Sequence, residues 1–180
     1  EYYRFLEEEH TAETIPLLVS HGAVNGLRSH NELVEDDLFN YGKFQSDDIN
    51  FYDDELVRIA KSGGLFGIQF DERRAGSEME VKKSGPNLNR RRMLFQKSKL
   101  IWNHIQHIAE VLNRHDQFAW GIQCIGSDYD GMVNPLNGFW SAGEMPLLDS
   151  YLEKHAYNFI ASNQSDNLRS FNKLRASDIV

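Results

Sequence analysis

Two short stretches carry side chains of the kind that chemistry at a metal ion uses. In "VSHG", residues 19–22, His21 follows an apolar run, and a neutral imidazole in this place is able to bind a metal ion. In "IGSDYDG", residues 125–131, Asp128 and Asp130 follow another apolar run, and carboxylates there are able to ligate a metal or take a proton from water. Each stretch also has an ordinary interpretation, as a loop-edge histidine with a backbone partner and as an aspartate-rich turn.

A third stretch, "FDERRAG" (residues 70–76), offers charges that a substrate could use. Arg73 and Arg74 are able to hold a substrate carboxylate through paired hydrogen bonds, and the alternative is a solvated charge cluster on a loop. Cys124 lies within an apolar run and is expected to be a buried, inert thiol.

Two further groups are better explained by structure than by chemistry. His104 and His107 in "HIQH" share one face of a helix, but a mid-helix position favours a packing or surface role over metal binding. The basic run "NRRRMLFQKSK" (residues 89–99) indicates a solvated helix start. A nucleic-acid surface is disfavoured because the whole chain has a net charge of -8.

Composition limits the class of protein. The 180 residues fit one domain, 1–180, and the single cysteine excludes an intrachain disulfide. No apolar run approaches the roughly 20 residues that span a membrane, so no transmembrane segment is expected. Glycine-rich phosphate loops and the nucleophile elbow of serine hydrolases are absent from the sequence. The chain opens without Met and reads as mid-helix, so we expect it to be part of a longer protein.

The elements that must position these residues alternate along the chain. Three apolar runs predict strands, and the first of them, with both faces apolar, is expected to be a buried strand. Periodic apolar stripes between the runs predict helices. The polar stretch 71–87 is expected to be a loop, and the helix that follows it is the longest. Asp53 and Asp54 begin the helix that Gly63 and Gly64 end. The expected strands cover 15–19, 65–70 and 117–126, and the expected helices cover 1–13, 53–62, 88–113, 144–160 and 164–175.

This alternation predicts an α/β fold with parallel strands and right-handed crossovers. Two architectures remain open: a doubly wound open sheet, or a portion of a closed (β/α)8 barrel with about three strand–helix units and a closing helix. In both, the carboxyl ends of the strands carry the functional residues. His21 and Asp128 are therefore expected on the same face, and each strengthens the interpretation of the other.

Four stretches in order, "PLLVSHG", "DDELVRIAKSGGLFGIQF", "HIQHIAEVL" and "IGSDYDG", resemble the membrane (renal-type) dipeptidase family of the metal-dependent amidohydrolase superfamily. The resemblance covers about residues 15–135. It implies the C-terminal portion of a (β/α)8 TIM-like barrel with two zinc ions per complete site. It implies that His21 binds metal, that Asp128 binds metal and handles the proton of the activated water, and that Asp130 lies near the substrate.

The function that the resemblance implies is part of a zinc-dependent hydrolase, which cleaves a dipeptide or similar amide with a metal-activated water. It further implies a small peptide or amide substrate and a periplasmic, extracellular or membrane-associated location. No nucleic-acid partner is expected, and the family pattern is compatible with a homodimer. The alternative is a catalytically inactive barrel that serves as a binding or scaffold protein. A domain that binds a phosphorylated ligand has little support without a phosphate loop.

The sequence departs from the family in two respects. The family's other metal ligands lie upstream of His21 and are not in this sequence, so the rest of the barrel is expected from upstream residues and this segment alone is expected to be inactive. The family's substrate arginine stands in an Arg-Asn pair. Here that place reads Ile49-Asn50, after an insertion from about Glu32 to Asp48, so Arg28, Arg73 and Arg74 become the candidates for the carboxylate.

Overall fold

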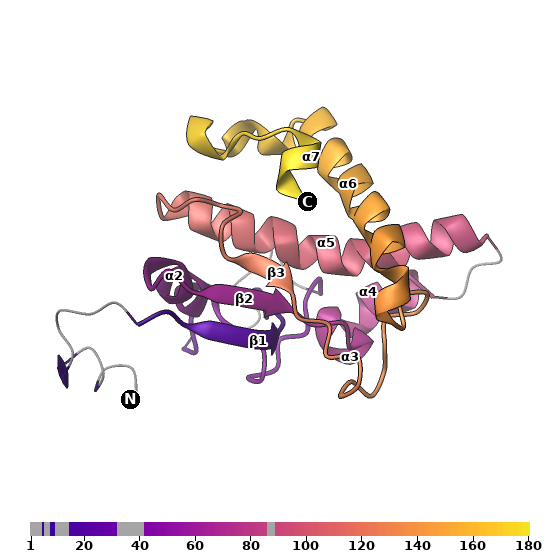
Figure 1. The fold of residues 1–180 in the computed structure, drawn as a ribbon, viewed down its shortest axis with the longest axis horizontal. Helices are drawn as coiled ribbons and strands as arrows, with labels where there is room; N and C mark the ends of the chain where they lie inside the picture. The colour runs from indigo at the N-terminus through magenta and orange to yellow at the C-terminus, as the bar shows by residue number, and fades with distance from the viewer. Residues whose placement is uncertain (1–4, 6–7, 10–14, 32–41, 86–88) are drawn as a thin grey trace.

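The computed structural model describes residues 5, 8–9, 15–31, 42–85 and 89–180. Most of the helix expected over 1–13, and residues 32–41 of the insertion, lie outside the described residues. The chain has an α/β fold with an open, three-stranded parallel sheet in the order β1-β2-β3 (Figure 1). The strands are β1 (Leu18–Gly22), β2 (Leu65–Ile68) and β3 (Gln123–Ile125). The prediction of three parallel strands is confirmed.

The first strand begins later than the apolar run that predicted it. Pro16 has no backbone N–H to offer a ladder, and the N–H of Leu17 donates to Ser62 Oγ at 3.0 Å. The carbonyl of Leu17 accepts from the N–H of Leu65 at 2.9 Å, and pairing with β2 begins at Leu18 and Val19. The register shifts between Val19 and Gly22, so His21 lies in an irregular part of the strand, close to its end.

The third strand is shorter than the run 117–126 because Asn172 takes over part of that run. Asn172 is fully buried, and its Oδ1 accepts from the N–H of Ala119 at 2.9 Å. Its backbone carbonyl accepts from Trp120 Nε1 at 2.9 Å. The backbone N–H of Ala119 is thus bonded to the C-terminal region rather than to a neighbouring strand, and pairing with β2 starts only at Gln123.

The long helices follow the sequence prediction closely. They are α2 (Asp53–Lys61), α5 (Arg90–Arg114) and α6 (Met145–Ala161), the last preceded by the 3₁₀ turn η2 (Ala142–Glu144). Glu55 accepts from the N–H of Tyr52 at 2.9 Å at the start of α2, and Gly63 adopts the predicted positive φ of 70° after its end.

Shorter helices differ from the prediction. The stretch 71–87, expected as a loop, contains α3 (Glu72–Ala75) and α4 (Glu78–Lys83). Asp71 and Ser77 begin these helices, because each side chain accepts from a backbone N–H of the first turn. The helix expected over 164–175 is replaced by the 3₁₀ turns η3 (Gln164–Asn167) and η4 (Ser170–Asn172), followed by α7 (Ala176–Ile179).

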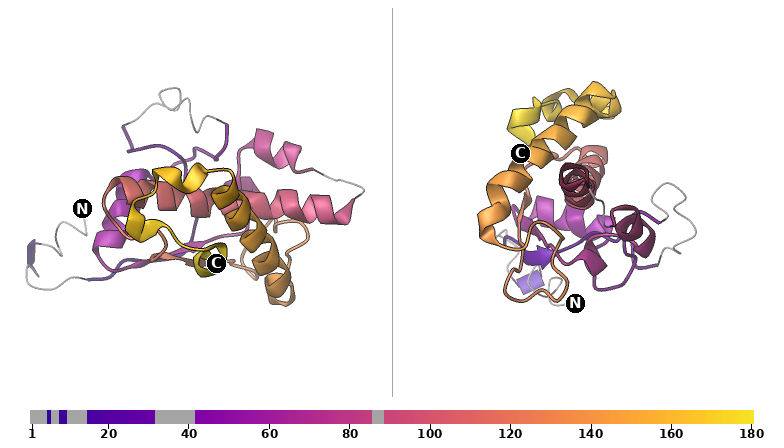
Figure 2. Two further views of the ribbon diagram at one scale, coloured as in Figure 1. Left: turned by 90° about the horizontal axis from the view of Figure 1, so that it is seen from above. Right: turned by 90° about the vertical axis from the view of Figure 1, so that its right-hand side faces the viewer.

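The two faces of the sheet differ. The helices α2 and α5 lie on one side of the sheet (Figure 2). Phe66 and Ile68 are fully buried and join the main core with Ile105. On the opposite face Leu18 is 73% exposed and Leu65 is 43% exposed. The expectation that β1 is buried on both faces is wrong, because in the described residues no element packs over its second face.

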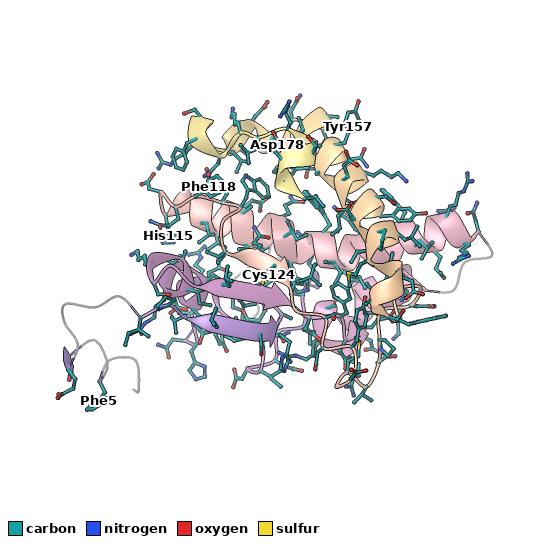
Figure 3. All side chains as sticks on the ribbon, viewed as in Figure 1. Phe5, His115, Phe118, Cys124, Tyr157 and Asp178 are labelled. Atoms are coloured by element: carbon teal, nitrogen blue, oxygen red, sulfur yellow. The ribbon has the colours of Figure 1, made fainter. Side chains whose placement is uncertain are left out.

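Cys124 on β3 is exposed rather than buried, which corrects the second expectation for this sheet (Figure 3). Partial burial of the thiol nevertheless raises its pKa, so the side chain stays a thiol at neutral pH. Within the described part of the chain, no helix combines the length and apolar character needed to cross a membrane, in agreement with the sequence.

Candidate functional site

The carboxyl ends of the three strands converge at two glycines. All three strands point toward the end of the molecule where α3 lies (Figure 1). A Cβ atom on Gly67 of β2, or on Gly126 just after β3, would collide with the carbonyl of Ser20. The lack of a side chain at both positions therefore lets the ends of β1 and β3 approach each other across β2.

This convergence brings His21 and Asp128 together, as the sequence predicts. His21 Nε2 lies 4.0 Å from Asp128 Oδ2, and the two side chains are 47% and 34% exposed. The other ring nitrogen, Nδ1, lies 2.9 Å from Ser20 Oγ, which fixes the orientation of the imidazole. A ring held at one nitrogen and open at the other is the arrangement that metal-ligating histidines use.

The turn that carries Asp128 leaves its carboxylate available. Asp128 has a positive φ of 57°, and its backbone carbonyl accepts from the N–H groups of Gly131 and Met132 at 2.9 and 2.8 Å. Among the described residues its carboxylate accepts no hydrogen bond, so the side chain does not cap this turn. Asp130 is exposed two residues further on.

Asp71 and Arg73 bind each other at the end of the middle strand. Arg73 donates from Nε to Asp71 Oδ1 at 3.0 Å and from a terminal nitrogen to Oδ2 at 2.6 Å. Burial opposes ionisation of Asp71, but hydrogen bonds from Arg73 and Asn134 outweigh it and hold its pKa below the ordinary value. Asp71 Oδ2 also lies 3.3 Å from the N–H of Val133, so Asp71 joins the end of β2 to the loop that carries Asp128. The guanidinium of Arg73 is already engaged by Asp71.

Arg74 is placed differently. Its Nε donates to Asn50 Oδ1 at 3.1 Å, and a terminal nitrogen donates to the carbonyl of Ile49 at 3.0 Å. Burial lowers the pKa of Arg74, while the nearby carboxylates of Asp71 and Asp128 raise it. The guanidinium of Arg74 therefore lies against the Ile49-Asn50 pair, and its charge interacts with Asp128. Among the described residues it forms no ion pair with a carboxylate.

His104 on α5 supports the loops beneath this site. It is fully buried, its Nδ1 accepts from the N–H of Val24 at 3.2 Å, and its Nε2 donates to the carbonyl of Ala75 at 2.8 Å. Burial lowers its pKa to about 3, so the ring is neutral. One histidine therefore joins the loop after β1 to α3, and the predicted packing role is confirmed.

His107, one turn along α5, supports the next loop. Its Nε2 lies 2.6 Å from Asp53 Oδ1, and Arg114 donates to Asp53 Oδ2 at 3.1 Å. His107 and Asp53 are both buried. The pair fixes the start of α2 against α5, so this histidine also has a structural place rather than an exposed metal-binding one.

The sequence did not reveal a buried ion pair between Lys97 and Glu72. Lys97 Nζ lies 2.8 Å from Glu72 Oε1, and the side chains are 4% and 10% exposed. The same carboxylate accepts from the N–H of Asn137 at 2.8 Å. Arg90, Arg91 and Arg92 are exposed as predicted for this basic run, but Lys97 joins α5 to α3 and to the loop that carries Asp128.

The described donors at the strand ends are fewer than a metal centre requires. Within the described residues, no group of three or more His, Cys, Asp or Glu side chains is placed to hold an ion. Three cavities along described residues, of 640, 340 and 370 Å³, are lined by other parts of the chain than His21 and Asp128. No protein-family model, curated protein or solved structure matches this chain.

Proposed function

We propose that this chain is the C-terminal portion of a (β/α)8 barrel and contributes to a zinc-dependent hydrolase that cleaves a dipeptide or similar amide. The observation that carries the proposal is the approach of His21 and Asp128 at the carboxyl edge of a parallel sheet, 4.0 Å apart and both open to solvent. Active-site residues of barrel enzymes collect at this edge.

The donor set fits zinc. An imidazole nitrogen and a carboxylate oxygen are among the ligands that zinc takes at about 2.0–2.2 Å, and Ser20 orients the imidazole for this role. His21 and Asp128 would hold the ion together with ligands from outside the described residues. Zinc, when bound, lowers the pKa of water to about 7. Asp128 would accept the proton of the attacking water and pass it to the leaving amine.

Arg74 supports a substrate that carries a carboxylate. It is the arginine whose guanidinium reaches the Ile49-Asn50 pair, and its charge interacts with Asp128. Arg73 is held in a bidentate pair by Asp71 and is less suited to the same task. Arg74 therefore binds the carboxylate end of a dipeptide, and Asp130, exposed beside Asp128, contacts the rest of the substrate.

The alternative function is that of a barrel that binds without hydrolysis. The observation that favours it is that the described residues present two metal donors rather than three. In that case the strand ends bind a partner or small ligand, and zinc neither binds tightly nor supports turnover.

The test uses the natural protein that carries this chain, with His21→Ala and Asp128→Asn compared against His115→Ala and Asp166→Asn. The two control residues are exposed and lie away from the strand ends. Zinc content after dialysis and hydrolysis of alanyl-alanine are measured. We expect His21→Ala to lose zinc, and Asp128→Asn to lose at least about 100-fold in hydrolysis. Wild-type zinc content and activity in both variants would contradict the assignment, and a wild type with neither property would establish the binding alternative.

A further inference from the structure

Two lysines on the side of α5 near α4 differ from the other lysines of that region. Lys82 and Lys83 of α4 form ion pairs with Glu78 and Glu80, at 2.7 and 2.6 Å. Lys43, in the loop before α2, and Lys99, on α5, are half-buried and form no ion pair with any described residue. The Lys43 ammonium lies over the ring of Phe44, 5.2 Å from its centre, which offsets its partial burial only in part. An ammonium group that is partly removed from water and has no carboxylate partner is energetically unfavourable, and such groups concentrate at functional sites.

Both lysines face open space. Lys99 lines two adjoining cavities of 640 and 370 Å³, and Lys43 lines the smaller one. Glu80, Lys83 and Gln164 also line both cavities. We call the combined space the α4–α5 groove. Its volume is in the range of small-molecule sites.

The groove has a polar end and an apolar end. Asn103 and Gln106 line the smaller cavity beside Lys43. Phe95, Trp102 and Phe159 line the larger cavity. A ligand with a charged group at one end and an apolar body at the other matches this division.

The charges around Lys99 leave the groove positive. Burial, followed by the charge of Lys43, lowers the pKa of Lys99, and Glu80 and Glu110 oppose this, so that the pKa is about 8. Glu80 is held by Lys83, and Glu110 accepts from Gln106 Nε2 at 2.8 Å.

Two neighbouring groups complete the electrostatic picture. Burial also lowers the pKa of Lys43 itself. His155 of α6 faces the larger cavity, and burial, followed by the charge of Lys99, lowers its pKa to about 4, so it is neutral at pH 7. A bound anion would stabilise the two partly buried ammonium groups, because it pairs with Lys43 and Lys99 at once.

We propose that the α4–α5 groove is a second binding site, independent of the strand ends, for a small organic anion. The carboxylate or phosphate of the ligand lies between Lys43 and Lys99, and its apolar body packs toward Phe95 and Trp102. The site requires no metal and does not depend on the hydrolase proposal.

The natural protein that carries this chain is titrated by isothermal calorimetry at pH 8 with phenyl phosphate, benzoate and inorganic phosphate. We expect saturable binding of a phenyl-bearing probe, tighter than that of inorganic phosphate, and the two phenyl probes distinguish a phosphate site from a carboxylate site. Binding should take up as much as about half a proton per ligand, because an anion raises the pKa of a Lys99 that is half protonated at this pH. Titrations in two buffers of different ionisation enthalpy measure this uptake.

The variants are Lys99→Met and Lys43→Met, with Lys173→Met as the control because Lys173 is exposed on another part of the surface. The first two should weaken binding at least about 10-fold, and Lys99→Met should also abolish the proton uptake. Both should keep the wild-type Tm, since each removes an unpaired charge rather than one half of an ion pair. Absence of saturable binding or of proton uptake in the wild type overturns the proposal, and so does equal affinity in the Lys99 and control variants.

Discussion

His21 at the strand ends is half exposed, with one ring nitrogen held by Ser20 and the other turned toward Asp128 at 4.0 Å. His104 on α5, beneath the same loops, is fully buried and has both ring nitrogens in hydrogen bonds. Both residues are histidines, but the two imidazoles differ in their exposure to solvent and in whether a ring nitrogen remains without a hydrogen bond. A side chain that is able to bind a ligand keeps some of its hydrogen-bonding capacity, whereas a structural one uses all of it.

The buried polar groups form a scaffold for the strand ends. His104 joins the loop after β1 to α3, the pair of His107 and Asp53 fixes α2, and the pair of Lys97 and Glu72 reaches the loop that carries Asp128. His104, His107 and Lys97 all lie on α5. If this division is right, changes in the scaffold should affect stability strongly, and changes at the strand ends should affect it less.

The largest effect is expected for Lys97→Met. The change leaves the buried carboxylate of Glu72 without its counter-ion, and breaking a buried pair in this way destabilises a fold by about 3–5 kcal/mol. Denaturant unfolding measures the loss. Lys82→Met is the matched control, because the pair of Lys82 and Glu78 is exposed to solvent and contributes little to stability.

The double variant Lys97→Met/Glu72→Gln sharpens this test. It removes both charges, so part of the lost stability should return. Equal effects of Lys97→Met and Lys82→Met would mean that the buried pair does not hold the scaffold.

The buried histidines His104 and His155 should make the stability of the fold depend on pH. Their pKa values in the folded protein are lowered to about 3 and about 4, below the ordinary value of 6.5, mainly by burial. The unfolded chain therefore binds more protons in this range, and stability present above pH 6.5 is lost as the pH falls. Each histidine contributes up to about 1.4 kcal/mol per pH unit, or roughly 2–3 kcal/mol by pH 4.5.

Denaturant unfolding with metal chelated, between pH 7 and pH 4.5, measures this loss. His155→Gln should reduce the slope by about half, and His115→Gln, at an exposed position, should leave it unchanged. Asp71 has a lowered pKa as well, but its contribution falls away only below pH 4. A stability that stays constant over the range would show that the two histidines are not buried in the neutral form.

The sequence predicted what local patterns determine. Alternating apolar runs indicated the parallel strands, and the stripe of Leu94, Ile101, Ile105 and Ile108 indicated α5. Lys97 lies within that stripe, three residues after Leu94 and four before Ile101, and this spacing was the signal that it is buried. The partner of Lys97 could not be found in this way, because Glu72 approaches only through the tertiary fold.

The ends of the strands were harder to predict, because hydrogen bonds from side chains distant in the sequence determine where pairing begins. Asn172 satisfies donors of the run before β3, and Ser62 satisfies the donor that precedes β1. Neither contact has a local signal in the sequence. The meeting of His21 and Asp128 was predicted from topology, since both follow parallel strands, but their distance depends on Gly67 and Gly126.

Gly126→Ala tests the contribution of these glycines, with the smallest expected effect on stability. The new Cβ meets backbone atoms of Ser20 and Gly67, which cannot rotate away as a side chain does, so we expect a loss of about 1–3 kcal/mol. The ends of β1 and β3 must then separate, and His21 moves away from Asp128. We therefore expect zinc affinity to fall by about 10–100-fold, as it does when the support of a metal ligand is lost.

Gly143→Ala is the matched control, because its Cβ would lie no closer than 3.4 Å to the Ser141 hydroxyl and its φ is not positive. The two measurements on Gly126→Ala separate the regions compared above. Reduced stability with unchanged zinc affinity would mean that the approach of the strand ends serves only the fold. Reduced zinc affinity beyond what the stability loss explains would mean that the two glycines set the distance at which His21 and Asp128 share an ion.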